Sequence, residues 1–271
     1  MTSPPDAASL LELAVATARE AAELVRQGRA AAGDDVAVKS SPVDVVTAVD
    51  TACEHLVVGR LLGARPDDGV LGEEGAQRAG TSGVRWIVDP IDGTVNFLYD
   101  LPAYAVSVAA EVDGTVVAGV VLNAATGELF TAVAGGGAFR STPGEPGPVR
   151  LTGSRATSLE LSLVATGFGY RVEQRRAQGA VVAALLPRVR DIRRHGSAAL
   201  ELCAAAAGRV DAYYEADLEP WDHAAGALVA AEAGLVLAGL PGRSLGDPLV
   251  VAAAPGIAGE LIAVLDELHR T

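Results

Sequence analysis

The segment Trp86-Ile87-Val88-Asp89-Pro90-Ile91-Asp92-Gly93-Thr94 joins an apolar run to two closely spaced carboxylates. Its apolar part, from residue 84 to residue 88, predicts a strand that ends at Asp89, and the proline and glycine that follow predict a tight turn. Such a strand end can aim the side chains of Asp89 and Asp92, together with the Ile91 carbonyl, into one cavity. Oxygen ligands of this kind suit Mg²⁺, Mn²⁺ or Ca²⁺, whereas zinc prefers His and Cys. The segment therefore predicts a site for a hard cation.

Two more acidic residues have neighbours that fit the same site. Glu73 stands between glycines in Leu71-Gly72-Glu73-Glu74-Gly75, in a loop that can approach closely. Asp222, in Glu219-Pro220-Trp221-Asp222-His223-Ala224-Ala225-Gly226, precedes a predicted helix with small residues in its first turn. Each acid alone has a simpler explanation as a turn residue or a helix N-cap, but the joint pattern predicts one site shared with the two acids of the strand end. We interpret Glu74 as a solvated loop acid or as a residue that supports the site from outside.

Cations held by carboxylates indicate phosphate ester chemistry. Enzymes accelerate phosphate monoester hydrolysis by as much as about 10²¹-fold, whereas one general base contributes only about 10²- to 10⁴-fold. Two cations about 3.5–4 Å apart can polarise the phosphoryl group and hold the attacking water. Gly93 and Thr94 open a predicted short helix whose free backbone amides suit a phosphate. We expect the Thr94 hydroxyl to orient the water, with Asp50 as its hydrogen-bond acceptor.

The acidic composition argues against nucleic-acid binding. The chain carries 21 Lys and Arg against 34 Asp and Glu, a formal net charge of −13, and its basic residues form no stripe. Nucleic-acid binding depends on phosphate neutralisation by Lys and Arg, so we do not expect it. An acidic protein still binds an anionic substrate when bound cations reverse the local charge. We therefore expect metal and substrate to bind together.

The sequence favours a cytoplasmic protein that has no membrane partner. It opens on Met-Thr-Ser-Pro-Pro-Asp, without the basic and apolar segments of a signal peptide. The most apolar tract, residues 224–240, is interrupted by Glu232 and predicts a buried helix and strand rather than a membrane span. Cys53 and Cys203 stand alone, which disfavours a zinc site or a disulfide and fits a reduced cytosol.

Helix and strand patterns share the chain and predict a layered α/β (α+β) fold. The length fits a single domain over residues 1–271, with two tightly packed lobes of about 1–142 and 149–271 that meet at a Pro/Gly-rich loop. We predict a loop at residues 39–42 and a bulge or turn at Gly135-Gly136-Gly137. Periodicity predicts helices over residues 6–26, 43–62, 173–186, 198–207, 221–233 and 256–269. It predicts strands over residues 84–88, 104–112, 115–122, 128–134, 161–166, 189–193, 212–215, 235–238 and 249–253.

Four stretches of the chain together resemble the inositol monophosphatases. They are Lys39-Ser40-Ser41-Pro42-Val43-Asp44-Val45-Val46-Thr47-Ala48-Val49-Asp50, Gly72-Glu73-Glu74, residues 86–97, and Asp211-Ala212-Tyr213-Tyr214-Glu215 through Gly234. They follow the order and approximate spacing of the family over most of the chain. The segment around residues 89–96 is specific to the wider lithium-sensitive phosphatases. The Asp-Ala-Tyr-Tyr-Glu segment narrows the resemblance to the bacterial inositol-1-monophosphatase type.

The resemblance implies an αβαβα layered sandwich of the inositol monophosphatase and fructose-1,6-bisphosphatase type. It further implies Mg²⁺ dependence, with two to three ions per site and Mn²⁺ as a substitute, together with inhibition by lithium and a homodimer. One metal would be held by Glu73, Asp89 and the carbonyl of Ile91. A second would be held by Asp89, Asp92 and Asp222, and Glu73 would hold a weaker third.

The resemblance also assigns catalytic and substrate-binding residues. It implies that Thr94 and Asp50 activate the water, and Glu73 takes part in catalysis through its metals. The phosphate would contact Gly93 and Thr94, and Lys39 would lie near the entrance. The polyol would be lined by Asp92, Gly196, Ser197, Ala198 and Glu215.

His195 departs from this resemblance, because the family more often has an apolar or small residue before Gly196-Ser197-Ala198. We interpret His195 as structural, with an accessory contact to the ligand as the alternative. The adjacent Arg193 and Arg194 leave three interpretations open: surface residues, interface residues, or sensors of a second anionic group on the substrate.

The sequence thus predicts a Mg²⁺-dependent phosphomonoesterase, an inositol-phosphate phosphatase that acts on inositol 1-phosphate and related polyol phosphates. A related phosphatase acting on histidinol phosphate, fructose 1,6-bisphosphate, NADP or a 3′-phosphonucleotide is the alternative. Glu215 favours hydroxyl groups or an amine in the substrate, because a carboxylate repels a second phosphate. A non-catalytic regulatory protein on the same scaffold is a further alternative, which the retention of Thr94, Asp50 and all four carboxylates disfavours as a sole role.

Overall fold

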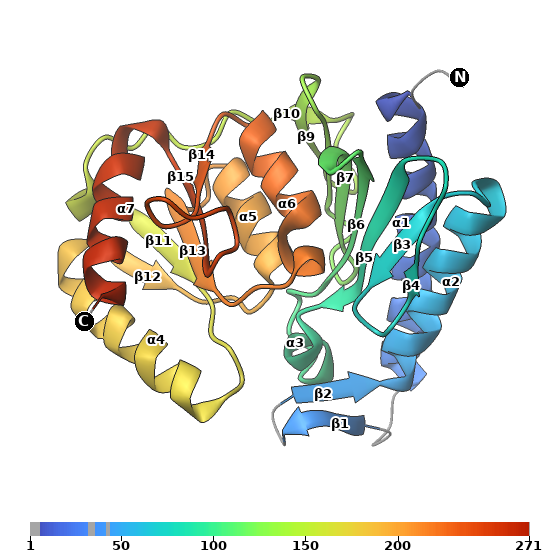
Figure 1. The fold of residues 1–271 in the computed structure, drawn as a ribbon, viewed down its shortest axis with the longest axis horizontal. Coiled ribbons are helices and arrows are strands. Elements are labelled where there is room, and N and C mark those ends of the chain that lie inside the picture. Colours follow the sequence, from blue (N-terminus) through green and yellow to red (C-terminus); the bar gives the residue numbers. More distant parts are fainter. Residues whose placement is uncertain (1–5, 32–35, 42–43, 271) are drawn as a thin grey trace.

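The computed structural model describes residues 6–31, 36–41 and 44–270, and it describes side chains over residues 6–30 and 48–270. Helices and sheets alternate in the order helices, sheet, helices, sheet, helices (Figure 1). The αβαβα sandwich expected from the sequence is therefore confirmed. Within the described part of the chain, we find no helix long and apolar enough for a membrane span.

The larger sheet is mixed, with strand order β10-β9-β8-β7-β6-β5-β3-β4. Only β3 and β5 run parallel, and the other neighbours form an antiparallel meander. Its strands are β3 (Gly69–Gly72), β4 (Gln77–Arg78), β5 (Val84–Asp92), β6 (Ala105–Val112), β7 (Thr115–Asn123), β8 (Leu129–Val133), β9 (Gly137–Ser141) and β10 (Val149–Arg150).

Two helices cover one face of this sheet and two cover the other. The outer pair is α1 (Ala7–Ala31) and α2 (Ala48–Ala64), and α3 (Thr94–Leu98) is a short helix after β5. On α1, small and apolar residues at helical spacing are fully buried against β6 and β7: Leu10, Ala14, Ala18, Ala21, Ala22 and Val25. The central pair is α5 (Ala198–Ala206) and α6 (Pro220–Glu232), which packs against both sheets.

The smaller sheet has strand order β12-β11-β13-β15-β14. Its strands are β11 (Leu163–Thr166), β12 (Asp191–Arg193), β13 (Ala212–Ala216), β14 (Val236–Ala238) and β15 (Leu249–Ala253). The last layer is α4 (Val172–Leu185) and α7 (Pro255–His269), and short 3₁₀ turns lie at η1 (Leu159–Leu161) and η2 (Leu186–Arg188). The helices α5 and α6 pack against both sheets. The division into two lobes at residues 143–148 stays a prediction.

Most of the predicted elements are confirmed within a few residues, and three predictions are wrong. The loop predicted at residues 39–42 falls on β1 (Val36–Ser41), and residue 42 lies outside the described residues. The helix predicted over residues 43–62 begins only at Ala48, after β2 (Asp44–Thr47), which pairs with β1. The strand predicted to end at Asp89 continues to Asp92. These short strands escaped prediction because they take their hydrogen bonds from distant partners or from a local hairpin, which periodicity does not report.

Candidate metal and phosphate site

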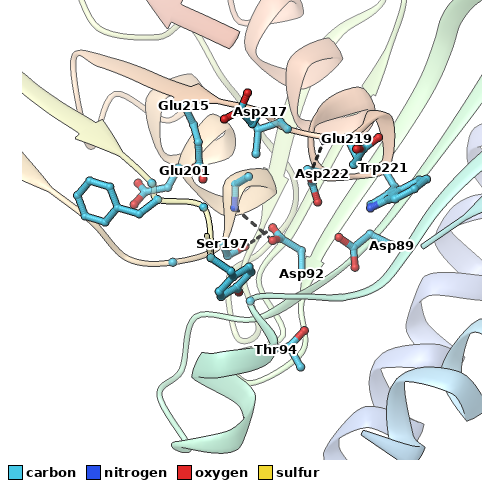
Figure 2. Close-up of a pocket in the computed structure, with 18 of the residues that line it drawn as sticks. Asp89, Asp92, Thr94, Ser197, Glu201, Glu215, Asp217, Glu219, Trp221 and Asp222 are labelled. Carbon is cyan, nitrogen blue, oxygen red and sulfur yellow. Dashed lines mark hydrogen bonds between the residues drawn. The ribbon is translucent and has the colours of Figure 1, made fainter. Parts of the chain in front are cut away.

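The four predicted carboxylates, Glu73, Asp89, Asp92 and Asp222, all line one cavity of about 390 Å³ between the large sheet and α6. Figure 2 shows Asp222 above Asp89 and Asp92 in one region of this cavity, with Thr94 below them. Three separate segments of the chain thus converge, as the sequence predicts.

A β-bulge points Asp89 and Asp92 to the same side of the sheet. Residues three apart on a regular strand face opposite sides. Here Asp89 pairs with Ser107 and Asp92 with Ala105, so three steps on β5 meet two on β6. The extra residue reverses the alternation of side chains along β5. The packing of two isoleucines shows this reversal: Ile87 packs towards α5 and α6, whereas Ile91 packs towards α1 and α2. Both carboxylates therefore reach the cavity.

Asp89 is a buried carboxylate surrounded by other acidic residues. Its side chain is 1% exposed, and its Oδ1 atom has no hydrogen-bond partner among the described residues. Burial raises the pKa of Asp89 well above its ordinary value, and the charges of Glu73, Asp92 and Asp222 raise it further. A buried carboxylate oxygen without a donor is costly unless a cation or proton compensates it.

Asp92 is held by the start of α5. Its Oδ2 accepts hydrogen bonds from Ser197 Oγ at 2.5 Å and from the Ala199 amide at 2.7 Å, and its Oδ1 accepts from the Ala198 amide at 3.3 Å. Burial raises the pKa of Asp92 to about 6, although these three donors act in the opposite direction. Ser197 also caps α5, because its Oγ accepts from the Leu200 amide. The predicted polyol contacts Ser197 and Ala198 thus support a predicted metal ligand.

Asp222 lies near the start of α6 (Pro220–Glu232), as in the helix predicted over residues 221–233. Because α6 begins at Pro220, Asp222 occupies its first turn, and its Oδ2 accepts a hydrogen bond from the Glu219 amide at 2.7 Å. Burial raises the pKa of Asp222 well above its ordinary value, with Asp92 as the next cause. The small residues that follow, Ala224 and Ala225, pack closely against the large sheet and bring Asp222 to the cavity.

Glu73 follows β3, and a buried glutamate that the sequence analysis missed fixes its loop. Glu54 of α2 is 3% exposed, and its carboxylate accepts from the amides of Glu74 at 2.8 Å and Ala76 at 2.9 Å. A Cβ at position 72 would stand 2.2 Å from Glu54 Oε2, so Gly72 permits this approach. Glu74 itself does not line the cavity. The sequence held a signal that could have identified Glu54 as buried, because Glu54 lies beside Cys53 and one helical turn after Asp50.

We expect Glu54→Ala to lower the free energy of unfolding by about 2–4 kcal/mol, because two amides would lose a buried acceptor. Urea unfolding measures the change. The matched variant Glu54→Gln keeps one acceptor oxygen and should lose less. Equal stability of Glu54→Ala and the unmutated protein would contradict the clamp.

Gly93 and Thr94, the predicted phosphate contacts, line the same cavity. Gly93 has a φ of 94°, and a Cβ there would approach the Ala103 carbonyl at 2.8 Å. The Thr94 hydroxyl donates to the Ile91 carbonyl at 3.1 Å. Asp50, on α2, is 1% exposed and lies outside the cavity lining, but its charge contributes to the raised pKa of Asp89. The role of Asp50 as an acceptor for Thr94 stays a prediction.

The cavity is also lined by Gly196, Ser197, Ala198 and Glu215, the predicted polyol contacts. Glu215 Oε2 accepts from the Tyr213 hydroxyl at 2.7 Å. Burial raises the pKa of Glu215 to about 7, and the charge of nearby Arg194 opposes the rise.

The structure also places the residues whose roles the sequence analysis left open. Arg194 lines the cavity and lies 5.9 Å from the Phe168 ring, whereas Arg193 pairs with Asp191 outside it. His195 is absent from the cavity lining, although its neighbours are present. The sequence analysis missed Asp217 and Glu201, which also line the cavity. The side chain of Lys39 lies outside the described residues.

Known proteins match this chain over most of its length. The inositol monophosphatase family matches residues 6–270. The chain belongs to the inositol monophosphatase family. The inositol-1-monophosphatase of Mycobacterium leprae is 48% identical over 287 residues, which cover 99% of this chain and 98% of the relative. The solved structure of Mycobacterium tuberculosis SuhB is similar with a TM-score of 0.83 and 46% identity, covering 99% and 98% of the two chains. The Nus factor SuhB of Escherichia coli is 37% identical over 235 residues, 86% of each chain.

The inositol monophosphatase family is typically metal-dependent, and the donor set of this chain fits a hard cation. Carboxylates and a backbone carbonyl are the ligands that Mg²⁺ and Mn²⁺ prefer. The donorless Oδ1 of Asp89 is the atom that a cation would satisfy. Within the described residues, no three His, Cys, Asp or Glu side chains lie close enough to form a ready-made cage. Asp92 and Asp222 accept hydrogen bonds from nearby amides.

Proposed function

We propose that this protein is a Mg²⁺-dependent phosphomonoesterase that hydrolyses inositol 1-phosphate and related polyol phosphates to the free alcohol and phosphate. The observation that carries the proposal is the convergence of four carboxylates from β3, β5 and α6 on one cavity, with a buried, donorless oxygen on Asp89. Family membership and the names of the mycobacterial relatives support the same activity.

We propose the metal ligands that the family resemblance implies, and the oxygen donors that line the cavity support them. Glu73, Asp89 and the carbonyl of Ile91 would hold one Mg²⁺, and Asp89, Asp92 and Asp222 a second, with Glu73 also holding a weaker third. Mn²⁺ has similar ligand preferences and would substitute. When bound, such ions polarise a phosphoryl group and stabilise the charge of the leaving oxygen.

The remaining steps are carried by residues of the chain. Gly93 and Thr94 would position the phosphate at the start of α3, and the hydroxyl of Thr94 would orient the attacking water. Asp50 would accept the hydrogen bond that keeps this hydroxyl aligned. Glu73 would hold its metals within reach of the water, so that its role in catalysis is indirect.

The alcohol end of the cavity favours a polyhydroxyl group. Glu215 and Asp217 supply acceptor oxygens, and the negative charge of Glu215 partly compensates the positive charge of Arg194. A second phosphate at this end would meet these carboxylates, which disfavours fructose 1,6-bisphosphate, NADP and 3′-phosphonucleotides. The amine of histidinol phosphate would be accepted, so that compound is the closest competitor. We also propose a cytoplasmic homodimer and inhibition by lithium.

A panel of phosphate esters tests the proposal. We expect inositol 1-phosphate to be hydrolysed in the presence of Mg²⁺ at a higher kcat/KM than histidinol phosphate, fructose 1,6-bisphosphate, NADP or a 3′-phosphonucleotide. Chelation of the metal should abolish turnover, and lithium should inhibit it. Phosphate release is the measurement. A higher kcat/KM for another member would overturn the substrate, and turnover without any divalent ion would overturn the mechanism.

The name of the Escherichia coli relative favours a second candidate, a partner-binding role in addition to catalysis. Complete loss of turnover against the whole panel, in a folded protein with Mg²⁺, would support that role alone. The retention of Thr94, Asp50 and the four carboxylates favours catalysis.

A further inference from the structure

The turn that carries Gly196 is held at the preceding residue, His195, through both its carbonyl and its amide. On one side, Asn96 Nδ2 of α3 donates to the carbonyl of His195 at 2.6 Å and to that of Ala103 at 2.7 Å. Asn96 is 4% exposed. Gly196, which follows, has a φ of 93°. The chain therefore turns sharply next to a fixed carbonyl.

On the other side stands Glu201, one helical turn into α5. Its Oε1 accepts from the His195 amide at 2.7 Å and pairs with His195 Nδ1 at 2.9 Å. Glu201 is 2% exposed, while the His195 side chain is 52% exposed. Both bonds of this buried carboxylate therefore go to one residue at the beginning of the turn.

Holding this turn gives a physical reason for a carboxylate at position 201. Burying a carboxylate is costly, and Oε2 of Glu201 has no hydrogen-bond partner among the described residues. Its neighbours in α5, Leu202 and Ala205, are apolar and fully buried. A leucine would fit such an environment without desolvation cost but would leave the His195 amide without its acceptor.

The turn presents three donors to Asp92. Ser197 Oγ, the Ala198 amide and the Ala199 amide all donate to its carboxylate. Gly196, Ser197 and Ala198 also line the cavity, where they are the proposed contacts of the alcohol. A shift of residues 195–197 would therefore change both the wall that faces the alcohol and the orientation of Asp92.

We propose that Glu201, together with His195, is a positioning residue that fixes the turn at residues 195–198 and so sets the preference for hydroxyl-bearing substrates. The functional half of this inference rests on the proposed phosphatase activity. The structural half does not, and the experiment separates them.

Hydrogen exchange tests the positioning directly. We expect Glu201→Leu to speed amide exchange in residues 195–199 by about tenfold or more, because the His195 amide loses its acceptor. Glu201→Gln keeps an acceptor oxygen and should restore slow exchange. Exchange in α7, on the far side of the small sheet, should stay unchanged. Unaltered exchange in residues 195–199 of Glu201→Leu would overturn the proposal.

Substrate preference tests the consequence. We expect Glu201→Leu to lower kcat/KM for inositol 1-phosphate about tenfold more than kcat/KM for p-nitrophenyl phosphate, which has no hydroxyl groups to recognise. The ratio of kcat/KM for inositol 1-phosphate to kcat/KM for p-nitrophenyl phosphate measures this preference. His195→Ala keeps the main-chain hydrogen bond to Glu201 and should lower this ratio about fivefold or less. His195→Asn keeps a side-chain donor and should restore the ratio. His195 is half-exposed, so these two variants should fold even where Glu201→Leu does not.

Two outcomes decide the functional half. The functional half is overturned if the ratio of the two kcat/KM values is unchanged. It is also overturned if both esters lose kcat/KM equally and in step with the melting temperature, because that result would show a merely structural role. If the unmutated protein hydrolyses neither ester, the proposed function fails, while the exchange result still decides the positioning.

Discussion

Asp92→Asn is expected to abolish phosphatase turnover, lowering kcat/KM for inositol 1-phosphate by about 10³-fold or more. Asp92 combines two proposed roles, as a metal ligand and as a substrate contact. An amide is neutral and a poor ligand for Mg²⁺, so the second metal would lose an anionic donor. The Asn side chain would also place an NH₂ group where the carboxylate now accepts hydrogen bonds from Ser197, Ala198 and Ala199. Steady-state phosphate release measures the loss.

Asp68→Asn is the matched control. Asp68 is also a 1% exposed aspartate, but it accepts hydrogen bonds from Trp86 Nε1 and Ser82 Oγ and does not line the cavity. It should lower stability while the folded enzyme keeps its kcat/KM. Full activity in Asp92→Asn would contradict the proposed site, and equal inactivation of both variants would point to a folding defect.

Mg²⁺ is expected to stabilise the metal-free protein, raising its melting temperature by roughly 5–10 °C at about 100-fold excess over Kd. The carboxylates of Asp89, Asp92 and Asp222 repel one another and are desolvated, so a cation that binds only the folded state relieves both costs. Thermal unfolding with and without chelator measures the shift, and Asp89→Asn should reduce it. No shift across millimolar Mg²⁺ would argue against the site.

The same stabilisation should depend on pH. The folded-state pKa of Asp92 is about 6 and that of Glu215 about 7, both above their ordinary values of 3.8 and 4.5. Because the folded state binds these protons more tightly, their stabilising contribution is fully present below about pH 4 and is lost as the pH rises through 6 and 7. The metal-free protein should therefore lose stability between about pH 5 and pH 8. Mg²⁺ requires ionised ligands, so its effect should be larger at pH 8 than at pH 5. A larger effect at pH 5 would refute this linkage.

Sequence analysis predicted the layered fold and the set of carboxylates at the cavity because these features have local signals. Apolar periodicity marks most helices and the longer strands, and glycine or proline beside an acid marks where an element ends. Asp89 and Asp222 could be found in this way. Short strands such as β3 and β1 could not, because their hydrogen bonds come from outside the segment.

Glu54 and Glu201 show a different limit. Both lie within helical patterns, where an isolated glutamate is ordinarily a solvated surface residue. Their positions among buried neighbours, Cys53 and Val57 for Glu54 and Leu202 and Ala205 for Glu201, were a signal that could have identified them. Which backbone amides they accept from, those of residues 74 and 76 and that of residue 195, depends on how the helices pack.

The sequence by itself determined the chemistry available to this protein: hard oxygen ligands, a threonine hydroxyl beside them, and a chain whose periodicity forms stacked helices and sheets. Only the tertiary structure decided how that chemistry is directed. The bulge between Asp89 and Asp92 places both carboxylates on one side of the sheet, and the packing of α6 brings Asp222 to them. The physical reason is that residue type and spacing act locally, whereas register and burial are set by contacts between segments that lie far apart in the chain.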